Sequence, residues 1–310
     1  MDEASYRRAE AALWDTVGVR PQEQRVRLTG TGTTVRVQSA GEGEPVLLVH
    51  GGPNAGSTFV PLVPGLLPGR RLLLLDRPGC GLSEPCGLDA RSLPGFADRF
   101  VTDVLDGLGL DRADVVASSF GGYLALRAAA ASPHRVRAMV QLGCPAFVPG
   151  MLVPPMMRAL SSPLRHLLTR LTPTERSSAA TMVQLGHGAT VRAGRIEPAL
   201  AAWGVSMQRD TDTFAHDAAL IARLVGPLRG ADPSLVLTAE LLARVAVPTL
   251  LLWGADDTFG GPQVAERLRS ALPEADLVVL PDSGHLPWFD DAARVAALAS
   301  DHLDRVTTAA

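Results

Sequence analysis

The chain has 310 residues, of which 46% are hydrophobic and 20% are charged, and its formal net charge is −3. This composition is typical of a globular protein with a large apolar core, and the near-balanced charge argues against a binder of nucleic-acid backbones. All 29 cationic residues are arginines. Because there is no lysine, Schiff-base chemistry, a pyridoxal-phosphate anchor and a phosphate-binding-loop lysine are excluded.

Other compositional signals argue against cofactors and membranes. The three cysteines, Cys80, Cys86 and Cys144, are too few for a disulfide framework, and neither they nor the histidines have metal-ligand spacing. No apolar run approaches the ~18 residues of a membrane-spanning helix, and no signal-peptide core or dinucleotide fingerprint appears. We therefore expect a cytoplasmic protein of bacterial type with no cofactor, no metal and no nucleic-acid or membrane partner. The oligomeric state is not indicated.

Short apolar runs along the chain predict strands. A polar and apolar alternation over 33–38 predicts an early edge strand. The runs that follow lack this alternation, as do strands of a parallel sheet with both faces buried. They cover 46–50, 72–76, 115–118, 136–142, 249–253 and 277–280.

Helical apolar spacing lies between these runs and predicts helices over 96–108, 120–131, 263–272 and 291–306. Strands that alternate with helices through short connections are typical of a doubly wound α/β sheet. The alternation breaks over 146–243, which contains five of the seven methionines and has helical but no strand-like patterns. We expect 1–145 and 244–310 to form the α/β core, and 146–243 to be a helical insertion.

One serine lies in a setting that suits a nucleophile. The segment Ala117-Ser118-Ser119-Phe120-Gly121 joins a predicted buried strand to a helix rich in small residues. Such a nucleophile elbow tolerates only small residues two positions on either side of the nucleophile. With Ser119 at the centre these positions hold Ala117 and Gly121, whereas a centre at Ser118 would place valine and phenylalanine there. Ser119 is therefore the candidate nucleophile, although Ala117 departs from the usual glycine.

A serine hydroxyl needs a base, and the base needs a carboxylate to fix its tautomer. His285 follows the last predicted strand and is the candidate base. His50 precedes Gly51-Gly52-Pro53, which we interpret as an oxyanion loop supported by His50. Either Asp256 or Asp257, directly after the strand over 249–253, could be the acid.

From about residue 30 onward the sequence resembles the capped α/β-hydrolase superfamily. The resemblance is carried by His50-Gly51-Gly52-Pro53, Asp76-Arg77-Pro78-Gly79-Cys80-Gly81-Leu82-Ser83, the Ser119 elbow, Trp253-Gly254-Ala255-Asp256-Asp257 and Asp282-Ser283-Gly284-His285. It implies an α/β-hydrolase fold, with a mostly parallel doubly wound sheet and 146–243 as a helical cap over the site. It further implies that Asp257 is the triad acid, that the backbone N–H groups of Gly52 and Phe120 form the oxyanion hole, and that the Asp76-Arg77 segment holds the oxyanion loop.

The expected activity is that of a serine hydrolase. It would cleave a carboxylic ester or related acyl bond of a small, largely apolar substrate through an acyl-enzyme. A serine at the elbow argues against epoxide hydrolases and haloalkane dehalogenases, which resemble this chain but use aspartate there. Candidate pocket residues are Trp288, Phe147 and Trp203.

Three alternatives stay open. Carbon–carbon hydrolases of dienoic ketoacids keep the serine triad, and a cap arginine could bind the substrate carboxylate; the candidates are Arg158, Arg165, Arg170, Arg192 and Arg195. Proline iminopeptidases share the His-Gly-Gly-Pro loop and need acidic cap groups to bind an amine; the candidates are Glu197, Asp210, Asp212 and Asp217. A ligand receptor on the same fold is the non-enzymatic alternative.

Overall fold

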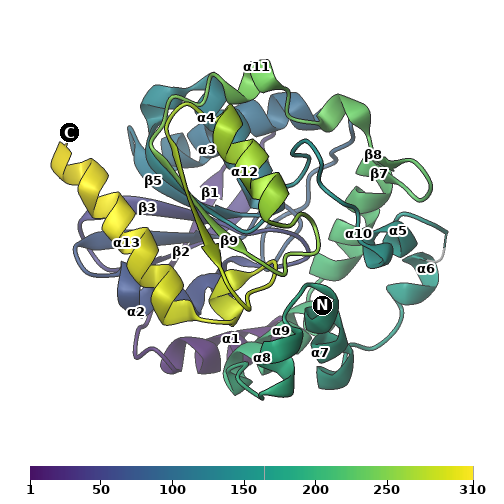
Figure 1. The fold of residues 1–310 in the computed structure, drawn as a ribbon. Helices are drawn as coiled ribbons and strands as arrows, with labels where there is room; N and C mark the ends of the chain where they lie inside the picture. Colours follow the sequence, from purple (N-terminus) through teal and green to yellow (C-terminus); the bar gives the residue numbers. More distant parts are fainter. Residues whose placement is uncertain (164, 310) are drawn as a thin grey trace.

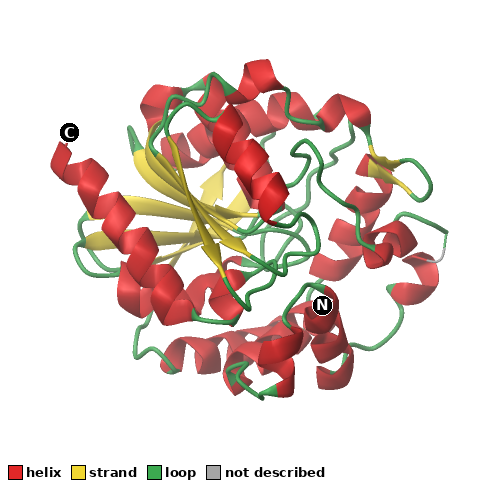
Figure 2. Cartoon of the chain, in the orientation of Figure 1, coloured by secondary structure: helices red, strands yellow, loops and turns green. Residues whose placement is uncertain are grey.

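The computed structural model describes residues 1–163 and 165–309. Its centre is an eight-stranded sheet with helices on both faces (Figure 1, Figure 2). The strand order is β1-β2-β4-β3-β5-β6-β9-β10. The strands are β1 (Gln22–Arg27), β2 (Thr34–Ala40), β3 (Glu44–Val49), β4 (Arg70–Leu75), β5 (Ala113–Ser118), β6 (Val136–Leu142), β9 (Thr249–Gly254) and β10 (Ala275–Leu280).

The sheet is parallel from β4 to β10, while β2 pairs antiparallel with both β1 and β4. The predicted doubly wound α/β fold is confirmed. The predicted edge position of the first strand is wrong, because β1 lies outside β2. Strand β10 is the opposite edge and is partly exposed rather than buried on both faces.

Alternating side chains of the strands fill two apolar cores, one on each face of the sheet. On one face, Leu47 and Val49 of β3 pack in a cluster with α3 (Leu93–Gly107), α4 (Phe120–Ala131) and α12 (Pro262–Ala271). On the other face, Val46 and Leu48 pack with α1 (Glu3–Asp15), α2 (Val63–Leu66) and α13 (Ala292–Ala309). This split follows from the two-residue period of a strand.

The segment between β6 and β9 contains most of the remaining helices. They are α5 (Pro155–Leu160), α6 (Arg165–Leu168), α7 (Glu175–Gln184), α8 (Gly188–Arg192), α9 (Pro198–Asp210), α10 (Thr213–Leu224) and α11 (Ala239–Leu242). It also contains a hairpin of β7 (Val225–Gly226) and β8 (Gly230–Ala231), although no strand was expected there. Strands of two residues leave no periodicity to detect in a sequence.

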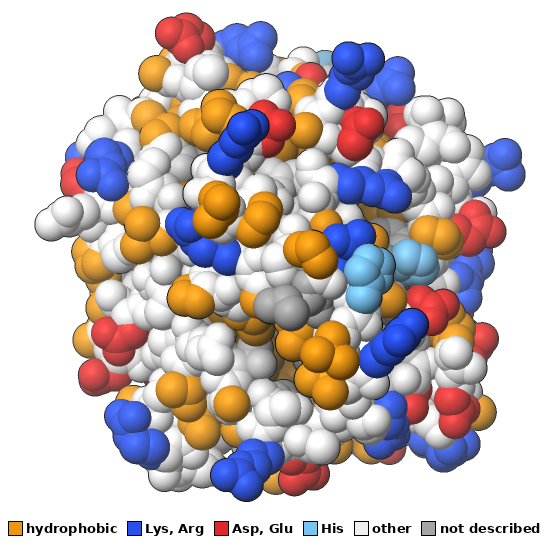
Figure 3. All heavy atoms as spheres, turned by 90° about the vertical axis from the view of Figure 1, so that its right-hand side faces the viewer, with side chains coloured by type: hydrophobic (Ala, Val, Ile, Leu, Met, Phe, Trp, Pro, Cys, Tyr) orange, Lys and Arg blue, Asp and Glu red, His pale blue; other side chains and the backbone are white. Residues whose placement is uncertain are grey.

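Different helices of this segment contact different surroundings. Helix α9 packs against α1, while α11 packs against α4 and contributes Leu241 and Leu242 to the first core. Figure 3 shows the side of the molecule with α5, α6 and the hairpin, where apolar and arginine side chains lie next to each other. Among described residues, the most exposed large apolar side chains of this segment are Leu152, Leu167, Leu171 and Leu228.

A buried ionic network attaches α1 to the sheet. Arg36 of β2 is 1% exposed and forms an ion pair with Glu10 of α1 at 2.5 Å. It also pairs with Asp76, after β4, at 3.3 Å. Helix α1 was not predicted from the sequence, and its inward residues Tyr6, Leu13 and Trp14 belong to the second core.

Candidate active site

Ser119 lies at the turn between β5 and α4 with φ 52° and ψ −119°. This is an unfavourable backbone conformation for a residue with a Cβ, and it raises the side chain above the end of the strand. A Cβ added at Gly51 would come within 2.6 Å of the Ser119 Cβ, and one at Gly121 within 2.1 Å of the Val49 carbonyl oxygen. Both glycines are therefore required by close packing. Ser119 is half-exposed, whereas Ser118 is fully buried and its hydroxyl has no hydrogen-bond partner.

The imidazole of His285, after β10, contacts the carboxylate of Asp257, after β9. His285 Nδ1 lies 2.9 Å from Asp257 Oδ2 and 3.0 Å from Oδ1. The carboxylate also accepts hydrogen bonds from the backbone N–H groups of Cys144 (2.8 Å) and Phe259 (2.9 Å). Asp257 is 5% exposed, whereas the neighbouring Asp256 is exposed to solvent. This arrangement suits an acid that orients a base.

The loop after β6 brings Ser119 and the Asp257–His285 pair together. Its Ala146 N–H donates to the Ser119 carbonyl oxygen at 3.0 Å, and its Cys144 N–H donates to Asp257. Gly143 has φ 68°, and a Cβ there would lie 2.1 Å from the His285 carbonyl oxygen. Ser119 and His285 form no direct hydrogen bond in the structure; in unliganded enzymes such contacts are often long and tighten on substrate binding.

Phe259 and Cys144 shape the surroundings of this pair. The Phe259 ring stacks on the His285 imidazole, with ring centroids 4.1 Å apart. Burial, reinforced by the Asp257 charge, raises the pKa of the Cys144 thiol well above its usual range. Cys144 is therefore protonated at neutral pH and is not a competing nucleophile. Sequence reasoning did not single out Phe259, whose only signal was its position two residues after Asp257.

Two backbone N–H groups, one directly after Ser119 and one in the loop that packs against it, have no acceptor in the described chain. They belong to Gly52, which is exposed, and to Phe120, the first residue of α4. A helix N-terminus and a free loop amide provide partial positive charge where an oxyanion would form.

His50 and Arg77 fix the loop that contains Gly52 through hydrogen bonds. The Arg77 N–H donates to His50 Nε2 at 3.0 Å, so Nδ1 bears the proton and donates to the Gly51 carbonyl oxygen at 2.6 Å. Burial, together with the Arg77 charge, holds the pKa of His50 well below its usual range. His50 is thus neutral and fully buried. It supports the loop and is not available as a base.

The Arg77 guanidinium connects the same loop to α10. It donates to the carbonyl oxygens of His50 and Gly51, both at 2.9 Å, and forms an ion pair with Asp217 at 3.0 Å. Burial opposes the charge, but Asp217 outweighs it and the pKa of Arg77 lies above its usual value. The Asp217 carboxylate lies so close to the oxyanion loop that a Cβ at Gly52 would be 2.3 Å from its Oδ2.

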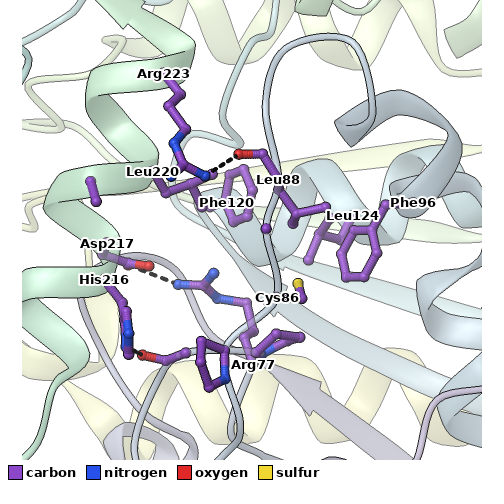
Figure 4. A pocket seen from close by; sticks show the side chains of 15 residues that line it. Arg77, Cys86, Leu88, Phe96, Phe120, Leu124, His216, Asp217, Leu220 and Arg223 are labelled. Atoms are coloured by element: carbon purple, nitrogen blue, oxygen red, sulfur yellow. Dashed lines mark hydrogen bonds and ion pairs between the residues drawn. The ribbon is translucent and has the colours of Figure 1, made fainter. Parts of the chain in front are cut away.

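A cavity of about 280 Å³ opens beside this ion pair, between α10 and the segment 77–88. Figure 4 shows that α10 side chains reach across to this segment at three levels. Besides Asp217, His216 contacts the Gly79 carbonyl oxygen at 3.1 Å and Arg223 donates to that of Leu88 at 3.2 Å. The Phe120 side chain lines this cavity, next to the proposed nucleophile.

The aromatic residues proposed for the pocket lie in the interior. Trp288 is 2% exposed, packs against Phe59 with tilted rings, and donates to the Thr58 carbonyl oxygen at 2.8 Å. Trp203 belongs to the same core, and Phe147 packs edge-on against Tyr123 in the other. None of the three lines the cavity of Figure 4.

Metal-binding clusters and membrane-spanning helices are both absent from the part of the chain that the structure describes. Among residues 1–163 and 165–309, no group of three or more His, Cys, Asp or Glu side chains is placed to hold a metal ion. Over the same residues, every helix is too short or too polar to cross a lipid bilayer.

Comparisons with known proteins agree with this architecture. A family model described as "alpha/beta hydrolase fold" matches residues 44–292. A 2-hydroxy-6-oxo-6-phenylhexa-2,4-dienoate hydrolase of Burkholderia cepacia is 28% identical, with 87% of this chain and 91% of that protein covered. A 2-hydroxymuconate semialdehyde hydrolase of Pseudomonas sp. strain CF600 is 27% identical, with 91% and 95% covered.

Among solved structures, a Bacillus subtilis carboxylesterase is similar, with TM-score 0.74, 18% identity, and 97% of this chain and 98% of that chain covered. A dienoate hydrolase from Rhodococcus sp. strain RHA1 has TM-score 0.71 and 20% identity, with 92% and 99% covered. At these identities the structures show a shared fold. The family model, however, spans most of the sequence, and the chain therefore belongs to the α/β-hydrolase fold family.

Proposed function

We propose that this protein is a serine hydrolase that cleaves a carboxylic ester or related acyl bond of a small, largely apolar substrate. Ser119 attacks the carbonyl carbon, and His285 takes its proton and returns it to the leaving group. Asp257 orients His285, and the N–H groups of Gly52 and Phe120 stabilise the oxyanion. Water then attacks the acyl-enzyme by the same route.

The observation that carries this proposal is the contact between His285 Nδ1 and a buried carboxylate that two backbone N–H groups hold in place. It fixes the tautomer that leaves Nε2 free to accept a proton. One unpaired amide directly follows the accessible serine of the elbow, and the other belongs to the loop whose Gly51 packs against that serine. A pocket that only binds its ligand, without reacting with it, would have no need for this combination.

The contacts and exposure of the four acidic cap residues argue against an aminopeptidase. Glu197 caps α9 by accepting from the Leu200 N–H at 2.7 Å, and Asp210 pairs with Arg209 at 2.7 Å. Asp217 forms an ion pair with Arg77, and Asp212 is exposed. None of the four is an unpaired buried carboxylate that could bind a substrate amine.

Hydrolysis of a carbon–carbon bond in a dienoic ketoacid is the second candidate function. The names of the curated relatives, at 27–28% identity over most of the chain, favour it. The structure gives less support to a binding site for the substrate carboxylate. Arg165 is half-exposed, and the other candidate cap arginines are exposed. In the described chain none of the five forms a hydrogen bond to the loops that hold Ser119, Asp257 and His285.

The test uses the two adjacent serines. Wild-type protein and a Ser118→Ala variant should react with a fluorophosphonate probe and turn over p-nitrophenyl esters. Ser118→Ala is a matched control because it removes a buried, unpaired hydroxyl. Ser119→Ala should abolish labelling and lower turnover by at least about 10³-fold. Retained activity in pure Ser119→Ala protein would refute the assignment.

A parallel assay distinguishes the two candidate substrates. The wild type is given p-nitrophenyl esters of increasing acyl length and a 2-hydroxy-6-oxo-dienoate, with kcat/KM measured for each. A higher kcat/KM for the esters supports the first function. A preference of 100-fold or more for the dienoate would replace it with the second. A burst of one equivalent of product per protein molecule, without steady-state turnover of any substrate, would favour a receptor.

A further inference from the structure

A turn of the cap inserts between the two loops that bear the proposed acid and base. This turn, residues 185–187, follows α7 and precedes α8. The Leu185 carbonyl oxygen accepts a hydrogen bond from the His285 N–H at 2.8 Å. Gly186 has φ 95°, and a Cβ there would lie 2.1 Å from the Asp256 carbonyl oxygen and 3.0 Å from the Gly284 Cα. The turn therefore packs backbone to backbone against both loops.

His187, the last residue of this turn, is fully buried and uses both ring nitrogens. The Leu286 N–H donates to its Nε2 at 3.2 Å, so Nε2 is the unprotonated nitrogen. Nδ1 then bears the proton and donates to Asp290 Oδ2 at 2.8 Å. The imidazole thus bridges the Leu286 amide, next to His285, and the Asp290 carboxylate, four residues after Leu286.

Asp290 completes the network. Its Oδ2 also accepts from the Gly284 N–H at 2.9 Å, and its Oδ1 accepts from the Thr190 hydroxyl at 2.5 Å. Burial works against ionisation, but the hydrogen bonds from His187, Thr190 and the Gly284 N–H outweigh it and lower the pKa of Asp290. A buried carboxylate with this many donors is a fixed anchor.

Taken together, three consecutive amides around the base are fixed. The N–H groups of Gly284, His285 and Leu286 donate to Asp290, Leu185 and His187, respectively. The Asp257 contact fixes only the side chain of His285. Its backbone needs these additional bonds, and two of the three come directly from the cap.

We propose that His187 is a positioning residue that, with Asp290, fixes the backbone of His285 and attaches the cap to the catalytic loop. This inference rests on the proposed function, since it assigns His187 a role through His285. Displacement of a catalytic group by about 1 Å can lower a rate by ~10². A residue that serves only to fill space in the cap would not have such an effect on kcat while KM stayed the same.

The experiment separates the two hydrogen bonds of His187. His187→Gln places an amide oxygen near the former Nε2, where it can accept from Leu286. His187→Asn places an amide N–H near the former Nδ1, where it can donate to Asp290. His187→Ala makes neither bond. His166→Ala is the matched control, because His166 is an exposed histidine of the same cap.

With a p-nitrophenyl ester we expect kcat to fall at least 10-fold in His187→Ala and His187→Asn, and clearly less in His187→Gln. KM should change less than 3-fold, and His166→Ala should match the wild type. Amide hydrogen exchange at Leu286 should speed up at least 10-fold in the Ala and Asn variants. If the Ala variant does not fold, kcat and Leu286 exchange are compared between the Asn and Gln variants alone.

Equal kcat in wild type, Asn and Gln variants, with unchanged exchange at Leu286, would overturn the role of His187. So would equal losses in the Asn and Gln variants that follow their melting temperatures. Failure of the proposed function has a different signature: the wild type itself would neither turn over nor label at Ser119.

Discussion

The substitution Asp257→Asn tests the site most directly, because the structure shows what each carboxylate oxygen does. Oδ2 accepts from the Cys144 N–H, Oδ1 accepts from the Phe259 N–H, and both lie within 3.0 Å of His285 Nδ1. An asparagine keeps one accepting oxygen and introduces an NH₂ group that only donates. Whichever way the amide turns, the NH₂ group faces a backbone N–H.

The cost has two parts. One buried backbone N–H is left without an acceptor, which we expect to lower the free energy of unfolding by about 1–3 kcal/mol. The imidazole also exchanges a charged acceptor for an amide whose NH₂ group donates to Nδ1, so the tautomer with its proton on Nε2 becomes favourable and Nε2 can no longer take the serine proton. The loss in kcat should be on the order of 10⁴.

The assay measures kcat with a p-nitrophenyl ester and the free energy of unfolding in urea for wild type, Asp257→Asn and Asp256→Asn. Asp256→Asn is the matched control: the same change one residue away, at an exposed side chain. It should retain kcat and stability. A folded Asp257→Asn protein with less than a 10-fold loss in kcat, or equal losses in both variants, would refute the reasoning.

Three further outcomes follow from two ion-paired side chains and one thiol. Arg36→Met should lower the free energy of unfolding in urea by about 3–5 kcal/mol, because it leaves Glu10 buried without its partner. Although burial opposes it, hydrogen bonding and nearby arginines hold the pKa of Glu23 at about 2, so its stabilising effect is present above about pH 4.5 and disappears as the pH falls toward 2. The stability difference between wild type and Glu23→Gln should therefore shrink over this range in urea titrations. Burial raises the pKa of Cys86 to about 11, and iodoacetamide at pH 8 should modify it far more slowly than free cysteine, as mass spectrometry would show.

The core of the fold could be predicted because its strands are continuous apolar runs. The predicted strand over 136–142 coincides with β6, and the helix over 120–131 coincides with α4. Strand β1 was not predicted, because Val26 is its only buried residue and its other positions are polar. An exposed edge strand of this kind carries no hydrophobic signal, and its place in the sheet comes from pairing with β2.

The contact between His285 and Asp257 could be anticipated because each residue lies in the loop after a strand, and parallel strands end at one edge of the sheet. The path of the segment between β6 and β9 could not be predicted. Nothing in the local sequence indicates that Asp217 meets Arg77, 140 residues away, or that His187 meets Asp290, 103 residues away. Such pairs depend on tertiary geometry alone, as does the interior position of Trp203.

The pairing of Asp217 with Arg77 leaves no room for a side chain at position 52, independently of the proposed oxyanion role of Gly52. Gly52→Ala would place a Cβ 2.3 Å from Asp217 Oδ2, whereas real Cβ contacts are not shorter than 3.0 Å, so a shift of at least 0.7 Å (3.0 − 2.3) is needed. The ion pair fixes the carboxylate, so the loop and its N–H must yield. We expect kcat to fall by about 10² while the melting temperature changes little. Gly95→Ala, in α3 with no atom within 4 Å of the added Cβ, is the control and should retain kcat. Full activity in Gly52→Ala would mean that this amide does not bind the oxyanion.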